Sequence, residues 1–340
     1  MEASRPSVMQ ALGRVLDDRY RLVELLGEGE MGAVYRAERR GATDVTVKIL
    51  HEDLGTDAAL RERFEREARA LFALAHRNIL AVHDFGVTEG SPYLAMELLQ
   101  GMSLDAYIER EDPPPRVALD LVRQMLTGLA FAHGRGVLHR DLKTENVFVT
   151  HDADGHPVAK LLDFGLVKFV DDERWGAANK LTVMGSVFGT PAYMAPEQCA
   201  GAPVTAAADV YAAGVILFEA LTGIWPFMEE SRVAMFKAHL TTPVPALGDA
   251  RPGLMASPEL DALVQRAMAK QAENRFRDAS EMLAALEALP SPAATRTDPS
   301  QSVVATRAKP VPPPILLWLG LGVGGLLLAA SLLALLFFLR

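Results

Sequence analysis

The sequence has almost no cysteine and no apolar run near its beginning. Cys199 is the one cysteine among 340 residues, which excludes an intrachain disulfide framework and a CxxC metal or redox site. We interpret it as a small, partly buried side chain in a reducing compartment. Arg5 and Arg14 are not followed by the roughly 7 to 15 apolar residues of a secretory signal, so we expect no signal peptide.

Basic residues are outnumbered by acidic ones, 34 to 43. The formal net charge is −9, which argues against nucleic acid as a partner. The composition, 50% hydrophobic and 23% charged, is that of a globular protein, and the length suffices for one two-lobed domain or two ordinary ones. Charged side chains are missing altogether from residues 315–339.

The order of hydrophobic patterns predicts an α+β fold. Alternating apolar and charged residues, interrupted by glycines, predict a short antiparallel meander over 20–50. A helix is expected to begin near Thr56, and further strands over 79–87 and 93–97. Apolar residues at helical spacing then predict helices over 117–132, 209–222, 232–239, 259–270 and 279–289. Strands first and helices second indicate a division near residue 100.

A glycine-rich stretch, LGEGEMGAV at 26–34, opens the meander. Gly27, Gly29 and Gly32 would let backbone amides bend over phosphate oxygens without interference from a Cβ atom. Taken alone, the stretch is better explained as an ordinary glycine-rich hairpin, because such hairpins are common. No Gly-Lys-Ser/Thr follows, so it is not a Walker loop, and the strand that follows disfavours a dinucleotide fingerprint.

Lys48 lies inside the β-patterned run that follows. It is either a second phosphate contact or a lysine reaching solvent at a strand edge. A buried ammonium group would need an anionic partner, which the next helix offers as Glu62, Glu65 or Glu67. We favour Glu67, because the apolar positions Phe64, Ala68 and Leu71 should turn that face toward the sheet.

Three motifs later in the chain decide the interpretation: HRDLKTEN at 139–146, DFG at 163–165 and APE at 195–197. In order and spacing they resemble the eukaryotic-type (Hanks-type) serine/threonine protein kinases, of the membrane-anchored kind found in bacteria. The resemblance covers about four fifths of the chain. It implies a bilobal kinase fold, with a small, mainly antiparallel β lobe containing one helix and a larger helical lobe.

The resemblance also implies roles for the residues of these motifs. Asp141 would accept or orient the proton of the substrate hydroxyl, and Lys143 would lie near the transferred phosphoryl group. Asn146 and Asp163 would hold Mg²⁺, with Mn²⁺ as an alternative, because oxygen ligands suit a hard cation. The remaining catalytic pair would be Lys48 with Glu67.

ATP is the cofactor that the resemblance implies, and residues before and after the motifs would form its pocket. Glycines 27, 29 and 32 and Lys48 would bind the phosphates. The adenine would lie between Leu26 and Val34 above and Phe148 below, next to a gatekeeper, Met96, and it would bind the backbones of Glu97 and Leu99.

Other matching positions imply structural roles. Asp209 would support the catalytic loop from a buried helix, Glu197 would pair with Arg275, and His139 would be a packing residue rather than an acid or base. The chain departs from the family at Thr46, where alanine is usual, and at Thr144, where proline is usual. Neither departure removes a charge or a metal ligand. The turn at 152–155 lacks the ligand spacing of a calcium loop, and we interpret it as a hairpin before the DFG strand.

The hydroxyl class and the regulatory sites also follow from the resemblance. Lys143 and the stretch GTPAYM at 189–194 are typical of the serine/threonine branch. Arg140 before the catalytic aspartate is typical of kinases whose activation segment carries a phosphate. We expect autophosphorylation at Thr182, with Ser186 the weaker candidate; unmodified loop hydroxyls are the alternative.

The domain boundaries are predicted from composition. Residues 1–19 form an extension and 20–290 the kinase domain, with its lobes at 20–99 and 100–290. Residues 291–314 form a linker rich in Pro, Ser and Thr, and 315–339 a transmembrane helix about 37 Å long. We expect a single-pass protein of the cell membrane with the kinase domain in the cytoplasm, because Arg307 and Lys309 flank the apolar run.

A GxxxG pair, Gly320 and Gly324, suggests a homodimer through this helix; lipid-facing filler explains it nearly as well. The predicted function is transfer of the ATP γ-phosphate to Ser/Thr hydroxyls of protein substrates in membrane-tethered signalling. Two other classes stay open, an ATP-binding pseudokinase that acts as a scaffold and a membrane adaptor with an inert globular part. Retention of the charged motif residues argues against the first, and the motif order is unexplained by the second.

Overall fold

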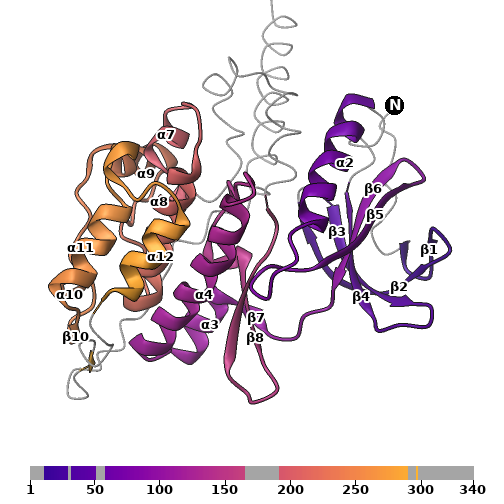
Figure 1. The fold of residues 1–340 in the computed structure, drawn as a ribbon, viewed down its shortest axis with the longest axis horizontal. Coiled ribbons are helices and arrows are strands. Elements are labelled where there is room, and N and C mark those ends of the chain that lie inside the picture. Colours follow the sequence, from indigo (N-terminus) through magenta and orange to yellow (C-terminus); the bar gives the residue numbers. More distant parts are fainter. Residues whose placement is uncertain (1–10, 30–31, 51–57, 165–190, 290–295, 298–340) are drawn as a thin grey trace, which may run out of the picture. The chain divides into compact units, whose positions relative to one another are not determined.

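A six-stranded antiparallel sheet forms the first part of the fold. The computed structural model describes residues 11–29, 32–50, 58–164, 191–289 and 296–297. The sheet has the strand order β1-β2-β3-β4-β6-β5 (Figure 1). Its strands are β1 (Val15–Leu16), β2 (Tyr20–Gly29), β3 (Gly32–Arg39), β4 (Val45–Leu50), β5 (Val82–Thr88) and β6 (Ser91–Glu97). The meander over 20–50 and both later strands of this lobe are thus confirmed, whereas β1 was not predicted.

The two faces of this sheet have different partners because side chains alternate along a strand. Val45 and Val47 of β4 are buried in a small apolar cluster together with Tyr20 and Tyr35. Lys48, which follows Val47, is paired across the sheet with Leu94 of β6, which belongs to the larger core that continues into the helical lobe. The alternation therefore directs Lys48 toward the helical lobe.

One helix, α2 (Ala58–Phe72), packs against β5 and β6 of this sheet. Its apolar positions Phe64, Ala68 and Leu71 are buried, at 3%, 0% and 9% exposure, as their helical spacing predicted. The helix therefore presents the predicted face to the sheet.

A second, three-stranded sheet lies between the large sheet and the helices (Figure 1). It consists of β7 (Met102–Ser103), β8 (Val147–His151) and β9 (Pro157–Leu161), with β8 and β9 joined by the hairpin predicted at 152–155. Asp152 closes this turn, since its Oδ1 accepts from the N–H groups of Asp154 and His156 at 3.0 and 2.9 Å. β9 also joins the N-terminal lobe through a parallel bridge between Ile79 and Leu161.

The helical lobe is built around α8 (Ala206–Thr222). Every residue from 207 to 222 is buried, which matches a helix that is apolar on all sides. Asp209 and Glu219 are its two carboxylates, and both lie inside the protein at 2% and 1% exposure. Such groups are retained only where partners are built around them.

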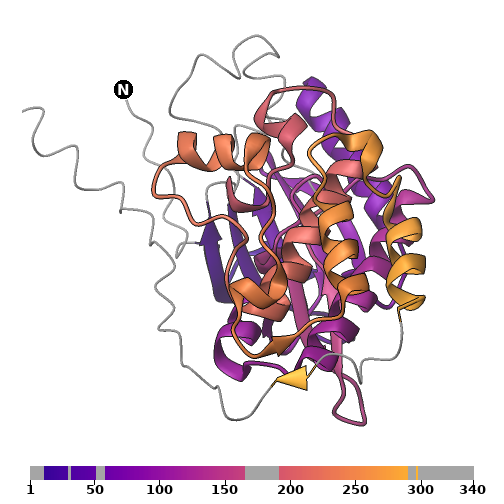
Figure 2. The ribbon, with the colours of Figure 1, turned by 90° about the vertical axis from the view of Figure 1, so that its left-hand side faces the viewer.

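The other helices surround α8 (Figures 1 and 2). α4 (Pro115–His133), α11 (Pro258–Ala267) and α12 (Ala279–Glu287) contact it directly. The remaining elements are α3 (Leu104–Glu111), η2 (Thr144–Asn146), η3 (Pro191–Tyr193), α7 (Pro196–Cys199), α9 (Arg232–Thr241), α10 (Leu247–Ala250), β10 (Leu254–Met255), η4 (Ala272–Asn274) and β11 (Arg296–Thr297). The five helices predicted from periodicity in this lobe are all present, whereas α3, α7 and α10 were not predicted.

Two sequence predictions about the later chain meet different outcomes. The stretch predicted as a linker contributes β11, which pairs with β10. Among the helices of the described residues, none combines the length and apolar character needed to cross a lipid bilayer. Residues 315–339 lie outside the described ranges, so the transmembrane helix stays a prediction. Cys199 is partly buried as expected, and burial raises the pKa of its thiol to about 12.

Candidate active site

The loop between α4 and β8 brings three predicted catalytic residues together. The Nδ2 of Asn146 donates to the backbone oxygen of Asp141 at 2.8 Å and to its Oδ2 at 3.2 Å. The Nζ of Lys143 lies 3.8 Å from the same Oδ2. One carboxylate oxygen of Asp141 therefore faces both an amide and an ammonium group.

The fourth predicted residue, Asp163, reaches this loop through the backbone. Leu162, just before it, donates its N–H to the carbonyl of Asn146 at 2.9 Å. Asp163 has a φ of 40°, a left-handed conformation that few residues with a side chain adopt. It is 45% exposed, and its Oδ1 lies 2.8 Å from the Nζ of Lys48. Lys48, Asp163, Asn146 and Asp141 thus form one continuous chain of contacts.

Asp209 of α8 holds the start of the loop in place. Its Oδ2 accepts from the backbone N–H of His139 at 2.7 Å, and its Oδ1 from that of Arg140 at 2.8 Å. His133 adds a contact from Nε2 to Oδ2 at 2.9 Å. Burial acts to raise the pKa of Asp209, but the bond from His133 and the other contacts bring it below the usual value. Because Arg140 has a φ of 64°, these bonds also stabilise a backbone conformation that is costly for a residue with a Cβ. The predicted supporting role of Asp209 matches this geometry.

His139 has the geometry of a packing residue. It is fully buried, and its ring lies 4.7 Å from that of Phe164, centroid to centroid. Its Nε2 donates to the carbonyl of Leu162 at 2.8 Å, since a carbonyl oxygen can only accept. Burial lowers the pKa of His139, so the imidazole stays neutral. It connects the catalytic loop to the DFG strand.

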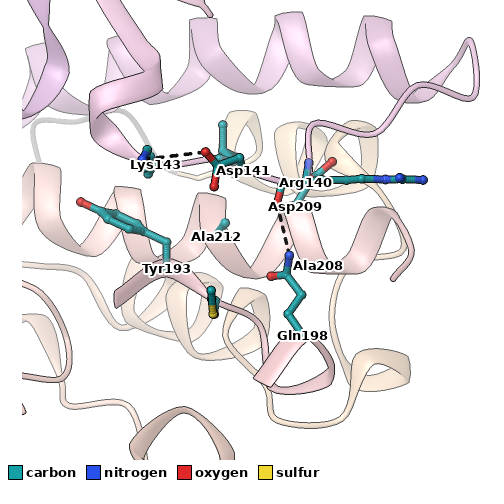
Figure 3. Close-up of a pocket in the computed structure, with 10 residues that line it drawn as sticks. Arg140, Asp141, Lys143, Tyr193, Gln198, Ala208, Asp209 and Ala212 are labelled. Carbon is teal, nitrogen blue, oxygen red and sulfur yellow. Dashed lines mark hydrogen bonds and ion pairs between the residues drawn. The ribbon is translucent and has the colours of Figure 1, made fainter. Parts of the chain in front are cut away.

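A pocket lies beside the same loop. Asp141, Lys143 and Tyr193 line one pocket, shown in Figure 3. Gln198 of α7 spans its edge, where its Nε2 donates to the carbonyl of Arg140 at 3.2 Å and its Oε1 accepts from the N–H of Ala195 at 2.9 Å. Gln198 was not singled out in the sequence, because a single glutamine in a helical turn carries no local signal.

The predicted adenine-side residues come from both sheets and from the segment after β6. Met96 is buried at 5% exposure near the end of β6, on the Lys48 side of the sheet. Leu26 is 47% exposed, whereas Val34, Phe148, Glu97 and Leu99 are partly buried. Gly32 has a φ of 148°, and a Cβ atom there would lie 1.9 Å from the carbonyl oxygen of Ile49. Only glycine fits at this position. Gly27 and Gly29 follow on the partner strand, paired with Val34 and Gly32.

An ion pair that sequence reasoning missed fixes the segment after Met96. The Nζ of Lys160 on β9 lies 2.7 Å from Oε1 of Glu97, and both side chains are largely buried. The same oxygen accepts the backbone N–H of Ala81 at 2.8 Å. Glu97, the last residue of β6, therefore binds both β9 and the backbone just before β5. The partners lie 63 residues apart, so no local pattern could have indicated the pair.

The helical lobe contains the predicted Glu197–Arg275 pair. Two parallel hydrogen bonds of 2.8 Å join the carboxylate and the guanidinium group, and the side chain of Arg275 is fully buried. Arg275 also donates to the carbonyls of Ala269 at 2.7 Å and Ala207 at 2.9 Å. The pair joins α7, which carries the APE motif, to the C-terminal helices.

The structure does not describe the side chains of three predicted residues. Position 67 belongs to α2, but the side chain of Glu67 is not described, so its pairing with Lys48 stays a prediction. Thr182 and Ser186 fall within residues 165–190, which the structure does not describe.

The comparisons with known proteins agree with this site. Residues 20–286 match the protein kinase domain family, and the chain belongs to this family. Its relatives identify it more closely as a bacterial serine/threonine kinase domain of the Hanks type.

The relatives are serine/threonine-protein kinases. PknH of Mycobacterium tuberculosis is 39% identical over 304 residues, covering 87% of this chain and 46% of PknH. Pkn3 of Myxococcus xanthus is 39% identical over 288 residues, covering 84% of this chain and 52% of Pkn3. The chain thus spans about half the length of these relatives. The crystal structure of the PknI kinase domain of Mycobacterium tuberculosis superposes with a TM-score of 0.62 at 28% identity, covering 82% of this chain and 98% of that domain.

Proposed function

We propose that the protein transfers the γ-phosphoryl group of ATP to serine and threonine hydroxyls of protein substrates. The observation that supports this best is the chain of contacts from Lys48 through Asp163 and Asn146 to Asp141, because these residues come from distant parts of the sequence. Phosphoryl transfer requires positioning and charge neutralisation far more than covalent chemistry. A lysine, two oxygen ligands and a carboxylate base in one place satisfy this requirement.

Each residue has a role that its surroundings support. Asp141 orients the acceptor hydroxyl and takes its proton, with Lys143 beside it to neutralise charge on the transferred group. Lys48 binds the phosphates under the glycine-rich hairpin, and Glu67 supports it. Adenine is held between the two sheets and the segment after β6, by Leu26, Val34, Met96, Glu97, Leu99 and Phe148.

The donor set of this site fits a magnesium ion, with manganese as an alternative. Asp163 offers a half-exposed carboxylate, and Asn146 uses its Nδ2 toward Asp141, so its amide oxygen is the atom that can bind a cation. Both donors are oxygen atoms, as hard divalent cations require. The bound ion would neutralise phosphate charge, while Lys48 and Lys143 neutralise charge from the protein side.

The test is phosphate transfer from labelled ATP to the chain itself and to a serine- and threonine-containing peptide pool. Asp141→Asn keeps the shape and removes the carboxylate, and we expect a loss of roughly a thousandfold or more in kcat. Asp154→Asn, in the exposed β8–β9 turn, is the matched control and should leave kcat unchanged. Transfer that is equal in wild type and Asp141→Asn would contradict the proposal and favour the scaffold alternative. Label on tyrosine rather than serine or threonine after acid hydrolysis would contradict the hydroxyl class.

Activation is proposed to follow autophosphorylation of Thr182, with Ser186 as the second candidate. Arg140 supports this, because it is poised before the catalytic aspartate and a phosphate would pair with a guanidinium group. Mass spectrometry after incubation with Mg-ATP should find phosphate in the 166–188 segment, and Thr182→Ala should lower activity more than Ser186→Ala. A fully active sample without phosphate in this segment would refute the idea.

Tethering to the cell membrane, with the kinase domain on the cytoplasmic side, is proposed from the sequence of residues 315–339. This run of 25 apolar residues exceeds the length that a bilayer core requires. The full chain should sediment with membranes after an alkaline wash, and a variant without residues 315–340 should not. Replacement of Gly320 and Gly324 by isoleucine tests the homodimer through crosslinking yield, and an unchanged yield would argue for lipid-facing glycines.

A further inference from the structure

A buried hydrogen-bond network joins the catalytic loop to the pocket beside it. The hydroxyl oxygen of Thr144 lies 2.7 Å from the phenol oxygen of Tyr193. Tyr193 donates to Oε2 of Glu219 at 2.6 Å, and Nε1 of Trp225 donates to Tyr193 at 3.0 Å. Thr144, Tyr193 and Glu219 are 0%, 3% and 1% exposed. Bonds at this depth are protected from competition with water.

The chemistry of the groups fixes the direction of each bond. A phenol has one proton to donate and can accept two hydrogen bonds. Burial raises the pKa of Tyr193 well above its usual value, so the phenol stays protonated. Its O–H group donates a hydrogen bond to the carboxylate of Glu219. Trp225 can only donate, so Thr144 is the donor in its contact of 2.7 Å with Tyr193; Glu219 at 3.3 Å and Glu145 at 3.5 Å are longer alternatives for the same proton. The shortest of these contacts makes the hydroxyl proton of Thr144 part of the network.

The network holds the far end of the loop that Asp209 holds at its start. Asp209 and Glu219 belong to the same helix, α8, ten residues and about 15 Å apart along its axis. Asp209 binds the N–H groups of His139 and Arg140, and Glu219 reaches Thr144 through Tyr193. Asp141 and Lys143 lie between these two anchors.

We propose that Thr144 is a positioning residue for phosphoryl transfer: its hydroxyl fixes Lys143 and Asp141 against Tyr193, on the side where the acceptor hydroxyl must enter. This inference rests on the proposed kinase function. The pocket shared by Asp141, Lys143 and Tyr193 is the physical link, because the neighbours of Thr144 line it (Figure 3). The contact between Lys48 and Asp163 is not part of this network, and Asn146 has its own bonds to Asp141, so we expect KM for ATP to be retained when the network is broken. The proline usual at this position has no proton to donate, so the anchor is a property of this chain.

Four variants of the full chain test the proposal. Thr144→Val keeps the volume and removes the hydroxyl, and Thr144→Ser restores it. Thr144→Pro also removes the hydroxyl, and it suits the backbone because Lys143 is already extended, at φ −161° and ψ 166°. Tyr193→Phe removes the partner oxygen. The measurements are kcat/KM for a peptide substrate, KM for ATP, and thermal unfolding.

Thr144→Val and Thr144→Pro should each lower kcat/KM for the peptide about tenfold, with KM for ATP unchanged and Thr144→Ser within about twofold of wild type. Tyr193→Phe should lower it similarly, and adding Thr144→Val to Tyr193→Phe should cost little more, because the two share one bond. The proposal would be overturned if Thr144→Ser lowered kcat/KM for the peptide as much as Thr144→Val. It would also be overturned if both Thr144→Val and Thr144→Pro kept the wild-type kcat/KM, or if the two losses multiplied in the double variant. Absence of transfer by the wild type would instead refute the kinase function itself.

Discussion

Acid should destabilise this protein through one buried histidine. His239 on α9 is 0% exposed, and the rings of Phe227 and Tyr211 lie edge-on to it at 5.2 and 5.6 Å. The hydroxyl oxygen of Tyr211 lies 2.8 Å from its Nδ1, a hydrogen bond that a neutral imidazole can make in either tautomer. Burial, with a contribution from the charge of Lys270, lowers the pKa of His239 from 6.5 to about 4.

The sign follows from proton binding in the two states. Between pH 6.5 and pH 4 the unfolded chain binds a proton at this position and the folded protein does not, so the free energy of unfolding falls as the pH falls. Above pH 6.5 this stability is fully present, and below pH 4 no more is lost. From pH 7 to pH 4.5 the loss amounts to roughly 2 to 3 kcal/mol, since one pH unit corresponds to about 1.4 kcal/mol.

The assay compares wild type with His239→Asn in urea at pH 7 and pH 4.5. Asparagine cannot bind this proton, and its amide group can still form a hydrogen bond with Tyr211, so the variant should lose roughly 2 to 3 kcal/mol less than wild type over this range. The control is His156→Asn in the β8–β9 turn, whose side chain is 76% exposed and which should behave as wild type. Identical losses in wild type and His239→Asn would refute the reasoning.

Three further predictions follow from single contacts. Glu197→Ala removes the carboxylate that pairs with a buried guanidinium group, so it should lower the free energy of unfolding, measured by thermal denaturation, by about 3 to 5 kcal/mol. The control, Glu65→Ala, breaks an exposed pair within a helix and should cost less than about 0.5 kcal/mol. Equal losses in the two variants would contradict this. Asp209→Asn places an amide NH₂ among donors and should lower kcat at least about tenfold in steady-state assays without a matching rise in KM for ATP, and unchanged kcat would show that the anchor is dispensable. Gly32→Ala should raise KM for ATP at least about tenfold, more than Gly27→Ala, where the added Cβ meets nothing within 4 Å; an equal effect of both would exclude the steric argument.

Much of the site could be predicted from the sequence because its residues lie in short motifs. HRDLKTEN and DFG indicate Asp141, Asn146 and Asp163 through their resemblance to the kinase motifs, whereas the direction of Lys48 became clear only from its pairing with Leu94 in the sheet. The face of α2 was likewise predictable, since Phe64, Ala68 and Leu71 repeat at helical spacing.

The missed features depend on contacts between distant residues or on very short elements. Glu97 and Lys160 become partners only after β6 and β9 are brought together, and neither has a periodic signature. Thr144 was visible as a departure from the family, but its role depends on Tyr193, 49 residues further on. α3 has only eight residues, of which Leu104 and Ile108 are buried, too few for a period to emerge.

One helix, α8, carries both anchors of the catalytic loop, Asp209 and Glu219, so a substitution far from the catalytic residues can displace the whole loop. Gly214 lies midway between Asp209 and Glu219, and a Cβ atom there would come within 2.8 Å of Met268 and 2.9 Å of Ala267. A slightly larger residue at this contact would push the helix away from its neighbour and tilt both anchors together. Temperature-sensitive alleles of this protein are therefore to be sought along the seam between α8 and α11, where every motif residue is left intact.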